Sequence, residues 1–206
     1  AEVPNCVPFR SVLAGCTFRG TEEQAADVAM RPGVLGVSKS QPVQAQEVTL
    51  PRRGSLTAEC TQNLDRINQR ALPLDEKCAF PNEGAGVTVY VLDTGIFTAH
   101  AEFGSRASIG IDILGGSGGD CNGHGTHVSG IAVGTTLGVA RAAKVIAVRV
   151  LDCGGSGTTE GVIRGLDWVL ANASRPAVVN MSLATFLPDS ALNEATENVV
   201  RAGIPV

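Results

Sequence analysis

Three runs of apolar, mostly β-branched residues constrain the fold of this chain more than any other feature. They cover residues 87–92, 144–150 and 177–181, which is the length of strands rather than of helices. Apolar residues stand next to each other within each run, so these strands are expected to be buried on both faces. A helix opened by Thr158 or Thr159 follows the second run, and a helix that Asp189 caps and Gly203 ends follows the third. Strands that alternate with helices predict an α/β fold with a parallel sheet and flanking helices.

The first 54 residues have a different pattern and are expected to form a small α+β unit followed by a linker. Thr21 is suited to cap a helix over residues 22–30, which Pro32 and Gly33 end. A short strand is predicted at residues 34–38. Residues 41–57 are polar and lack periodicity, which is typical of a linker between folded units. Residues 55–206 then form the second unit.

Composition excludes several classes of partner. The chain has 206 residues, of which 44% are hydrophobic, and a formal net charge of −4. Nucleic acid is not an expected partner, because binding it needs a basic face. A membrane span is not expected, because no run of about 18 apolar residues is present. The chain begins with Ala1 rather than Met, and residues 204–206 resemble the entry to a strand, so a fragment of a longer protein is expected. The protein is expected to be a monomer.

A carboxylate stands directly after the first apolar run. Asp93 leaves this run in the sequence Asp93-Thr94-Gly95. Ligands of open parallel sheets bind beyond the carboxyl ends of the strands, so Asp93 is a candidate for orienting a catalytic partner. The alternative is an aspartate that only caps a turn. Aspartic proteases also use Asp-Thr-Gly, but they need two such loops in an all-β setting, and this chain has one.

A histidine opens the helical pattern that follows. His124 lies between Gly123 and Gly125, which leave room for a substrate backbone. A helix N-terminus disfavours a charged imidazole, and a carboxylate on the other ring nitrogen, for which Asp93 is the candidate, would offset this effect and fix the tautomer. His127 is expected to pack inside the protein. No metal site is expected, because His-x-x-His here lacks the Glu of a zincin and a third ligand.

Asp93 before His124 is the chain order of subtilisin-type serine proteases. The chain resembles subtilases of the proteinase K branch, and the secreted aqualysin type among them, over roughly residues 60–206. The resemblance rests on the segments 64–67, 89–96, 102–103, 120–128, 138–140, 148–153, 155–158 and 180–183.

The resemblance implies a subtilisin-like α/β fold, incomplete in this chain, and a serine endopeptidase with an Asp-His-Ser triad. Asp93 and His124 are then two members of the triad. The family's motifs for the nucleophile, Gly-Thr-Ser-Met-Ala, and for the oxyanion asparagine, Ala-Gly-Asn, do not occur here. Both are expected beyond Val206, so the chain alone is expected to be inactive. The alternative from another class is a catalytically inactive homologue that acts as a protein-binding module.

Two segments are implied to bind a polypeptide substrate in an extended conformation. One resembles the exposed strand that pairs with the substrate backbone, and the other resembles the facing wall of the cleft. The family usually has Gly-Gly where this chain has Ala184-Thr185, which puts the side-chain preference in doubt. The implied substrate-binding residues are Gly155, Ser156, Gly157, Ser182, Leu183 and Ala184.

The N-terminal unit resembles the end of an inhibitory propeptide. The resemblance implies that this segment is a binding partner of the catalytic unit, which removes it by cutting at about residues 50–57. The alternative is an unrelated N-terminal extension.

Cysteines indicate the compartment. The resemblance implies a disulfide between Cys121 and Cys153, and closing this loop of roughly 33 residues contributes about 3–4 kcal/mol in the chain-entropy model. Disulfides point to an oxidising compartment, so a secreted, extracellular protein is expected. No cofactor can be assigned, although the family implies calcium in the full-length enzyme, mostly on residues beyond Val206. Proximity in the sequence alone suggests the pairs Cys6–Cys16 and Cys60–Cys78.

Overall fold

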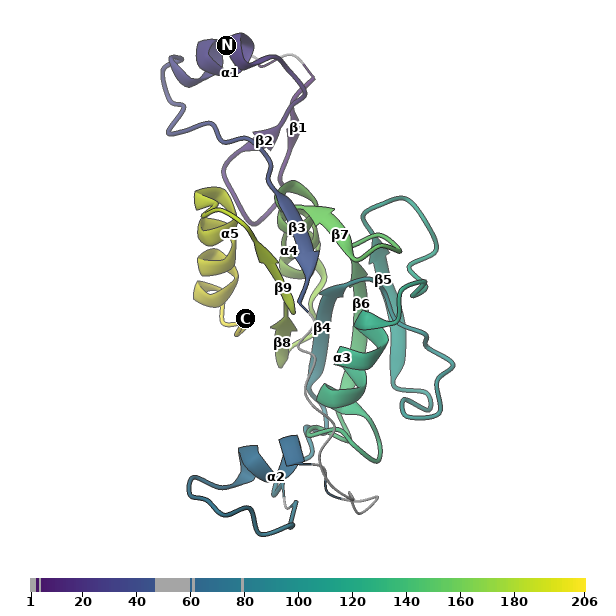
Figure 1. Cartoon of the computed structure of the whole chain (residues 1–206). Coiled ribbons are helices and arrows are strands. Elements are labelled where there is room, and N and C mark those ends of the chain that lie inside the picture. The colour runs from purple at the N-terminus through teal and green to yellow at the C-terminus, as the bar shows by residue number, and fades with distance from the viewer. Residues whose placement is uncertain (1–2, 4, 47–59, 61, 79) are drawn as a thin grey trace.

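The structure is a computed structural model, and it describes residues 3, 5–46, 60, 62–78 and 80–206. A parallel sheet in the order β5-β6-β4-β8 forms the centre of the molecule (Figure 1). Its strands are β4 (Thr88–Asp93), β5 (Ala107–Asp112), β6 (Lys144–Arg149) and β8 (Ala177–Asn180). The three strands predicted from apolar runs are confirmed, and their ends differ from the predicted ones by at most one residue. β5 at the sheet edge was not predicted.

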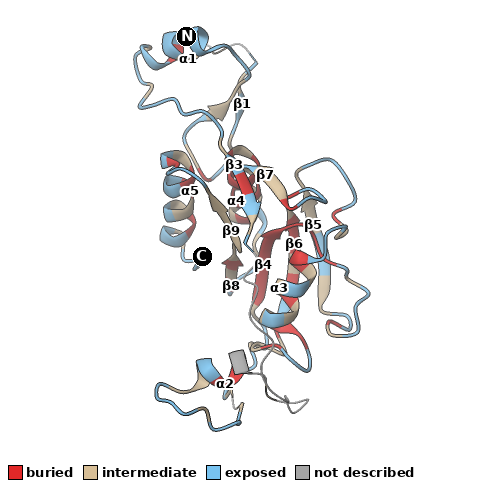
Figure 2. Ribbon diagram, in the orientation of Figure 1, coloured by how far each residue is buried: buried red, intermediate tan, exposed pale blue. Residues whose placement is uncertain are grey.

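Helices cover both faces of this sheet (Figure 1). They are α3 (His124–Val133) on one face, and α4 (Thr159–Asn172) and α5 (Ser190–Arg201) on the other. Val89 and Val91 of β4 pack in the apolar cluster that includes Val133 of α3. Tyr90 and Leu92 of the same strand pack in the cluster of α4 and α5. Figure 2 shows the resulting burial of β4, so the continuous apolar runs reflect a sheet that is covered twice.

Side-chain caps begin the helices at the predicted residues. Thr21 and Gln24 form a capping box at α1 (Glu22–Ala29). The Thr158 hydroxyl accepts a hydrogen bond from the Gly161 N–H at α4, and Asp189 accepts one from the Leu192 N–H at α5. These three helix predictions are therefore confirmed. A further short helix is α2 (Gln62–Asn68).

The N-terminal segment begins with a disulfide-closed hairpin. Its strands, β1 (Val7–Pro8) and β2 (Cys16–Thr17), are antiparallel, and a disulfide joins Cys6 to Cys16. The strand predicted at residues 34–38 is wrong: these residues form no strand, and Leu35 is fully exposed. Because Leu35 is exposed, this segment has no buried face that could pack against the rest of the protein as a strand would.

A strand lies further on, inside the predicted linker. β3 (Pro42–Ala45) is the middle strand of an antiparallel sheet, between β7 (Ser156–Thr158) and β9 (Leu183–Thr185). The linker prediction is therefore wrong for residues 42–45, while residues 47–59, and with them the expected cleavage region at 50–57, lie outside the described residues. Pro42 is a poor strand former, so β3 owes its conformation to partners on both sides.

Residues 204–206, expected to enter a strand, form none. The Pro205 carbonyl nevertheless accepts a hydrogen bond of 2.8 Å from the Val179 N–H, so the segment runs beside β8. In the part of the chain that the structure describes, no helix has the length and apolar character needed to cross a membrane.

Candidate active site

Asp93 ends the central strand β4, and its side chain is completely buried. The Thr94 N–H donates a hydrogen bond of 2.7 Å to Oδ1. Burial raises the pKa of Asp93, and hydrogen bonds from His124 and Thr94 offset part of that rise. The chain then turns through Gly95, which has a φ of 109°. A Cβ there would lie 2.6 Å from the Gly118 carbonyl oxygen, so only glycine fits.

His124 is the first residue of α3, and it reaches Asp93 directly. Its Nδ1 lies 2.8 Å from Oδ1 and 2.9 Å from Oδ2 of the carboxylate. A carboxylate only accepts hydrogen bonds, so Nδ1 carries a hydrogen. Gly125 permits this close approach, because a Cβ at that position would lie 2.2 Å from the Gly95 carbonyl oxygen. The structure thus brings together the two residues that the sequence predicted as a catalytic pair.

His127 does not pack inside the protein, and this prediction is wrong. It is exposed, whereas Gly125, Ser129 and Val133 are buried along the inner side of α3. These residues recur every four positions, and His127 falls on the opposite side of the helix. Among the described residues, no three His, Cys, Asp or Glu side chains gather where they could hold a metal ion.

A main-chain carbonyl faces the second ring nitrogen of His124. Nε2 lies 3.1 Å from the carbonyl oxygen of Gln46, the residue that follows β3. A carbonyl oxygen only accepts hydrogen bonds, so His124 binds the Gln46 carbonyl when Nε2 carries a hydrogen. Sequence reasoning missed Gln46, because no motif marks it and only the fold brings it to the histidine.

All six residues predicted to bind an extended substrate lie beside the chain's own residues 43–46. Gln44 is paired with Ser156 on one side and Ala184 on the other, Val43 is paired with Gly157, and Ala45 with Leu183. The Ala45 N–H donates to the Gly155 carbonyl at 2.8 Å, and the Gln46 N–H donates to the Ser182 carbonyl at 3.0 Å. The N-terminal segment therefore occupies the predicted substrate cleft, with Gln46 at His124.

Ala184 stands where the family usually has glycine, and it does not interrupt the pairing of the cleft wall. It is paired with Gln44 in the antiparallel register of β3 and β9. One side chain of the bound segment is anchored deeply. Val43 is completely buried and belongs to the same apolar cluster as Val150 and Leu151.

A disulfide joins the two sides of the site. The structure pairs Cys121 with Cys153, as the resemblance implied, with the Cα atoms 5.1 Å apart. The Asn122 side chain donates a hydrogen bond of 3.0 Å to the Cys153 carbonyl. These contacts connect the loop before His124 to the loop before β7. Cys60 pairs with Cys78, as proximity suggested.

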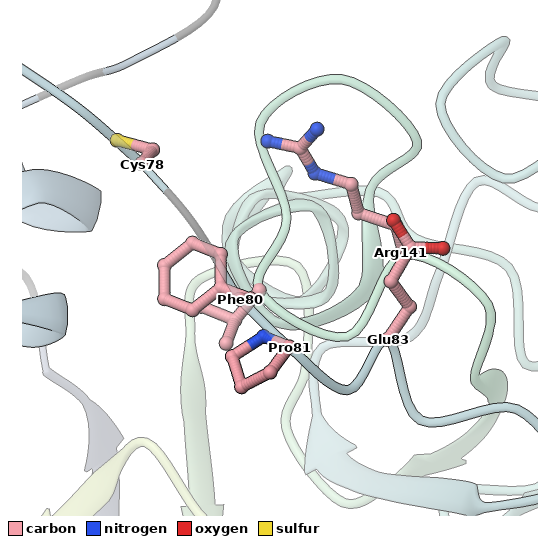
Figure 3. Close-up of a pocket in the computed structure, with 6 residues that line it drawn as sticks. Cys78, Phe80, Pro81, Glu83 and Arg141 are labelled. Atoms are coloured by element: carbon pink, nitrogen blue, oxygen red, sulfur yellow. The ribbon is translucent and has the colours of Figure 1, made fainter.

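A separate surface pocket contains none of the predicted site residues (Figure 3). It is lined by Cys78, Phe80, Pro81, Glu83, Val139 and Arg141.

Comparison with known proteins assigns the family. Residues 84–203 match the model of the Subtilase family. The extracellular serine proteinase of Thermus sp. (strain Rt41A) is 44% identical over 200 residues, which are 96% of this chain and 47% of that protein. Alkaline serine exoprotease A of Vibrio alginolyticus is 50% identical over 198 residues, 95% of this chain and 36% of that protein. The chain belongs to the subtilase family, and it spans about half or less of these relatives' length.

A solved structure agrees with this assignment. The crystal structure of a cold adapted subtilisin-like serine proteinase superposes with a TM-score of 0.67 at 47% identity. The match covers 71% of this chain and 54% of that one. The predicted subtilisin-like α/β fold is confirmed.

Proposed function

We propose that this chain is part of a secreted serine endopeptidase. The observation that carries the proposal is the buried pair of Asp93 and His124 at the end of a cleft in which an extended chain is bound as a third strand. The names of two relatives support this proposal, since one is an extracellular serine proteinase and the other a serine exoprotease.

In the proposed reaction, a serine outside these 206 residues attacks the carbonyl carbon of the scissile peptide. His124 Nε2 takes the serine proton and then passes it to the leaving amine, so the peptide C–N bond breaks as an acyl-enzyme forms. Asp93 holds the Nδ1 hydrogen and stabilises the imidazolium between these two transfers. Water then releases the acyl group by the same proton path.

The substrate is proposed to be a polypeptide bound by backbone pairing to residues 155–157 and 182–184, as residues 43–46 are here. We propose a monomer without nucleic-acid or membrane partners, in keeping with a net charge of −4.

The N-terminal segment is proposed to be an inhibitory propeptide. Because the Gln46 carbonyl lies at His124 Nε2, the bond that follows Gln46 is the one presented to the catalytic pair. We expect the mature enzyme to begin at Glu47, upstream of the region that the family resemblance favours. Amino-terminal sequencing of a processed, serine-containing form checks this, and a first residue between 50 and 57 would contradict it.

A labelling experiment tests the proposed function. The 206-residue chain is expected to be unreactive towards a fluorophosphonate and inactive on casein, because the nucleophile motif is absent. A form extended to include a Gly-Thr-Ser motif is expected to label and to cleave casein, and a His124→Ala variant of that form is the matched control. Stoichiometric labelling of the short chain would overturn the assignment of the nucleophile. An extended form that folds but never labels would favour the inactive binding module.

Calcium remains a proposal for the longer enzyme. Among the described residues, Asp65 Oδ1 and Asn68 Oδ1 are buried without a hydrogen-bond partner, and carboxylate and amide oxygens are ligands that Ca²⁺ prefers. A calcium titration followed by thermal unfolding measures whether the ion stabilises the fold.

A further inference from the structure

The half-buried carboxylate of Asp120 accepts hydrogen bonds from residues next to Asp93 and from residues next to His124. Asp120 Oδ1 accepts from the Asn122 N–H at 3.0 Å, the Gly123 N–H at 2.9 Å and the Thr94 hydroxyl at 2.9 Å. Its Oδ2 accepts from the N–H of Thr126 at 2.9 Å and from the hydroxyl of Thr126 at 2.5 Å. The five donors come from the loop after β4 and from the first turn of α3 with the loop before it.

Part of this arrangement is a helix cap. Gly123 stands at the N-cap of α3 and has no side chain to accept a hydrogen bond. Asp120 fills that role by accepting from the Thr126 N–H in the first turn. A cap alone explains the contacts with Asn122, Gly123 and Thr126, but it does not explain the contact with Thr94.

Thr94 connects this carboxylate to the catalytic pair. Its N–H binds Asp93 Oδ1, and its hydroxyl, which donates to Asp120, accepts from the Gly125 N–H at 3.0 Å. Thr94 is fully buried, so it has no water to take the place of these partners. The Thr94 hydroxyl therefore lies between the Asp93 loop and the residue that follows His124.

The carboxylate stays charged in this position. Burial raises the pKa of Asp120, but hydrogen bonds from Gly123, Thr126 and Asn122 outweigh burial and hold the pKa below its ordinary value. A charged carboxylate is an acceptor only, which matches five donors and fixes the direction of each bond.

We propose that Asp120 is a positioning residue for the catalytic pair, which it acts on through Thr94 and the first turn of α3. By holding these two elements together, it keeps His124 Nδ1 within hydrogen-bonding distance of Asp93. The proposal rests on the proposed function only in calling the pair catalytic, because the geometry of the pair is present in the 206-residue chain itself.

The test separates positioning from capping by observing the Nδ1–H proton of His124 in the 206-residue chain by NMR. Asp120→Asn is expected to broaden or abolish this resonance, because an amide turns an N–H towards one of the present donors. Thr94→Val is expected to do the same although it leaves the bond from the Thr126 N–H to Asp120 in place, and Thr94→Ser, which keeps the hydroxyl, is expected to retain the signal. Asp189→Ala, which removes a cap from α5 only, is expected to leave the signal unchanged.

If Thr94→Val leaves the Nδ1–H resonance as it is, Asp120 is only a helix cap and the proposal is overturned, even where Asp120→Asn itself fails to fold. In a serine-containing form, Asp120→Asn is expected to lower kcat by about 10²-fold with little change in KM. Absence of the resonance from the unsubstituted chain would instead count against the catalytic pair, and so against the proposed function.

Discussion

Replacing Asp93 by Asn is expected to lower kcat by about 10⁴-fold in a form of the enzyme that carries the serine. The Asp93 carboxylate accepts the Nδ1 hydrogen of His124 at 2.8 Å in a site without exposure to solvent. An amide at this position favours the other tautomer of the imidazole, whose Nε2 then carries hydrogen and cannot take the serine proton. Steady-state kinetics on a peptide substrate measure the effect, and KM is expected to change little, because Asp93 does not touch the cleft strands.

Asp189→Asn is the matched control for this substitution. Asp189 is also a buried carboxylate, but it caps α5, and asparagine caps a helix nearly as well. We expect this variant to keep its kcat. If Asp93→Asn retained kcat within a few-fold of the control, the pair would not be the catalytic one.

The sheet and its helices could be predicted because their signals are local. Apolar runs marked β4, β6 and β8, and single capping residues such as Thr158 and Asp189 marked the helix starts. β5 gave no such signal. It lies at the edge of the four-stranded sheet, beside β6, and shifts register between Ile109 and Ile111, so it needs no continuous apolar run.

The N-terminal segment could not be predicted in the same way, because its structure depends on distant partners. The sequence of β3 predicts a linker, and this segment is a strand because it pairs with Gly157 on one side and Ala184 on the other. Gln46 likewise becomes a site residue only when β3 is placed in the cleft. The motif residues Asp93 and His124 were predictable because their chain order and glycine neighbours carry chemical information of their own. The role of Asp120 was not, because it depends on which donors the folded loops direct at it.

The other large effect is expected at Asp167, which lies on α4 and holds the N-terminal segment to the catalytic unit. Its buried carboxylate accepts hydrogen bonds from three successive backbone N–H groups, those of Arg10, Ser11 and Val12, at 2.6–3.0 Å. Val12 is buried in the cluster of α4 and α5, and its carbonyl accepts from the Asn198 side chain at 2.9 Å.

Asp167→Ala is expected to loosen this attachment by about 2–5 kcal/mol, because three backbone N–H groups, of which that of Val12 is buried, lose a charged acceptor at once. At 1.4 kcal/mol for each factor of ten, hydrogen exchange at Arg10, Ser11 and Val12 should then accelerate by about 30-fold or more, while amides of β4 keep their protection. Native-state exchange measured by NMR on the 206-residue chain gives both quantities in one experiment.

Glu197→Gln on the neighbouring helix α5 is the matched control for the attachment. This substitution removes an exposed ion pair with Arg201, which contributes at most about 0.5 kcal/mol, and should leave the exchange rates at residues 10–12 unchanged. Equal rates in the Asp167 variant and this control would mean that Val12 and the Cys6–Cys16 hairpin hold the segment without the carboxylate. Faster exchange in the Asp167 variant alone would show that α4, away from the cleft, holds the N-terminal segment. Binding of this segment could then be weakened without altering a residue that lines the cleft.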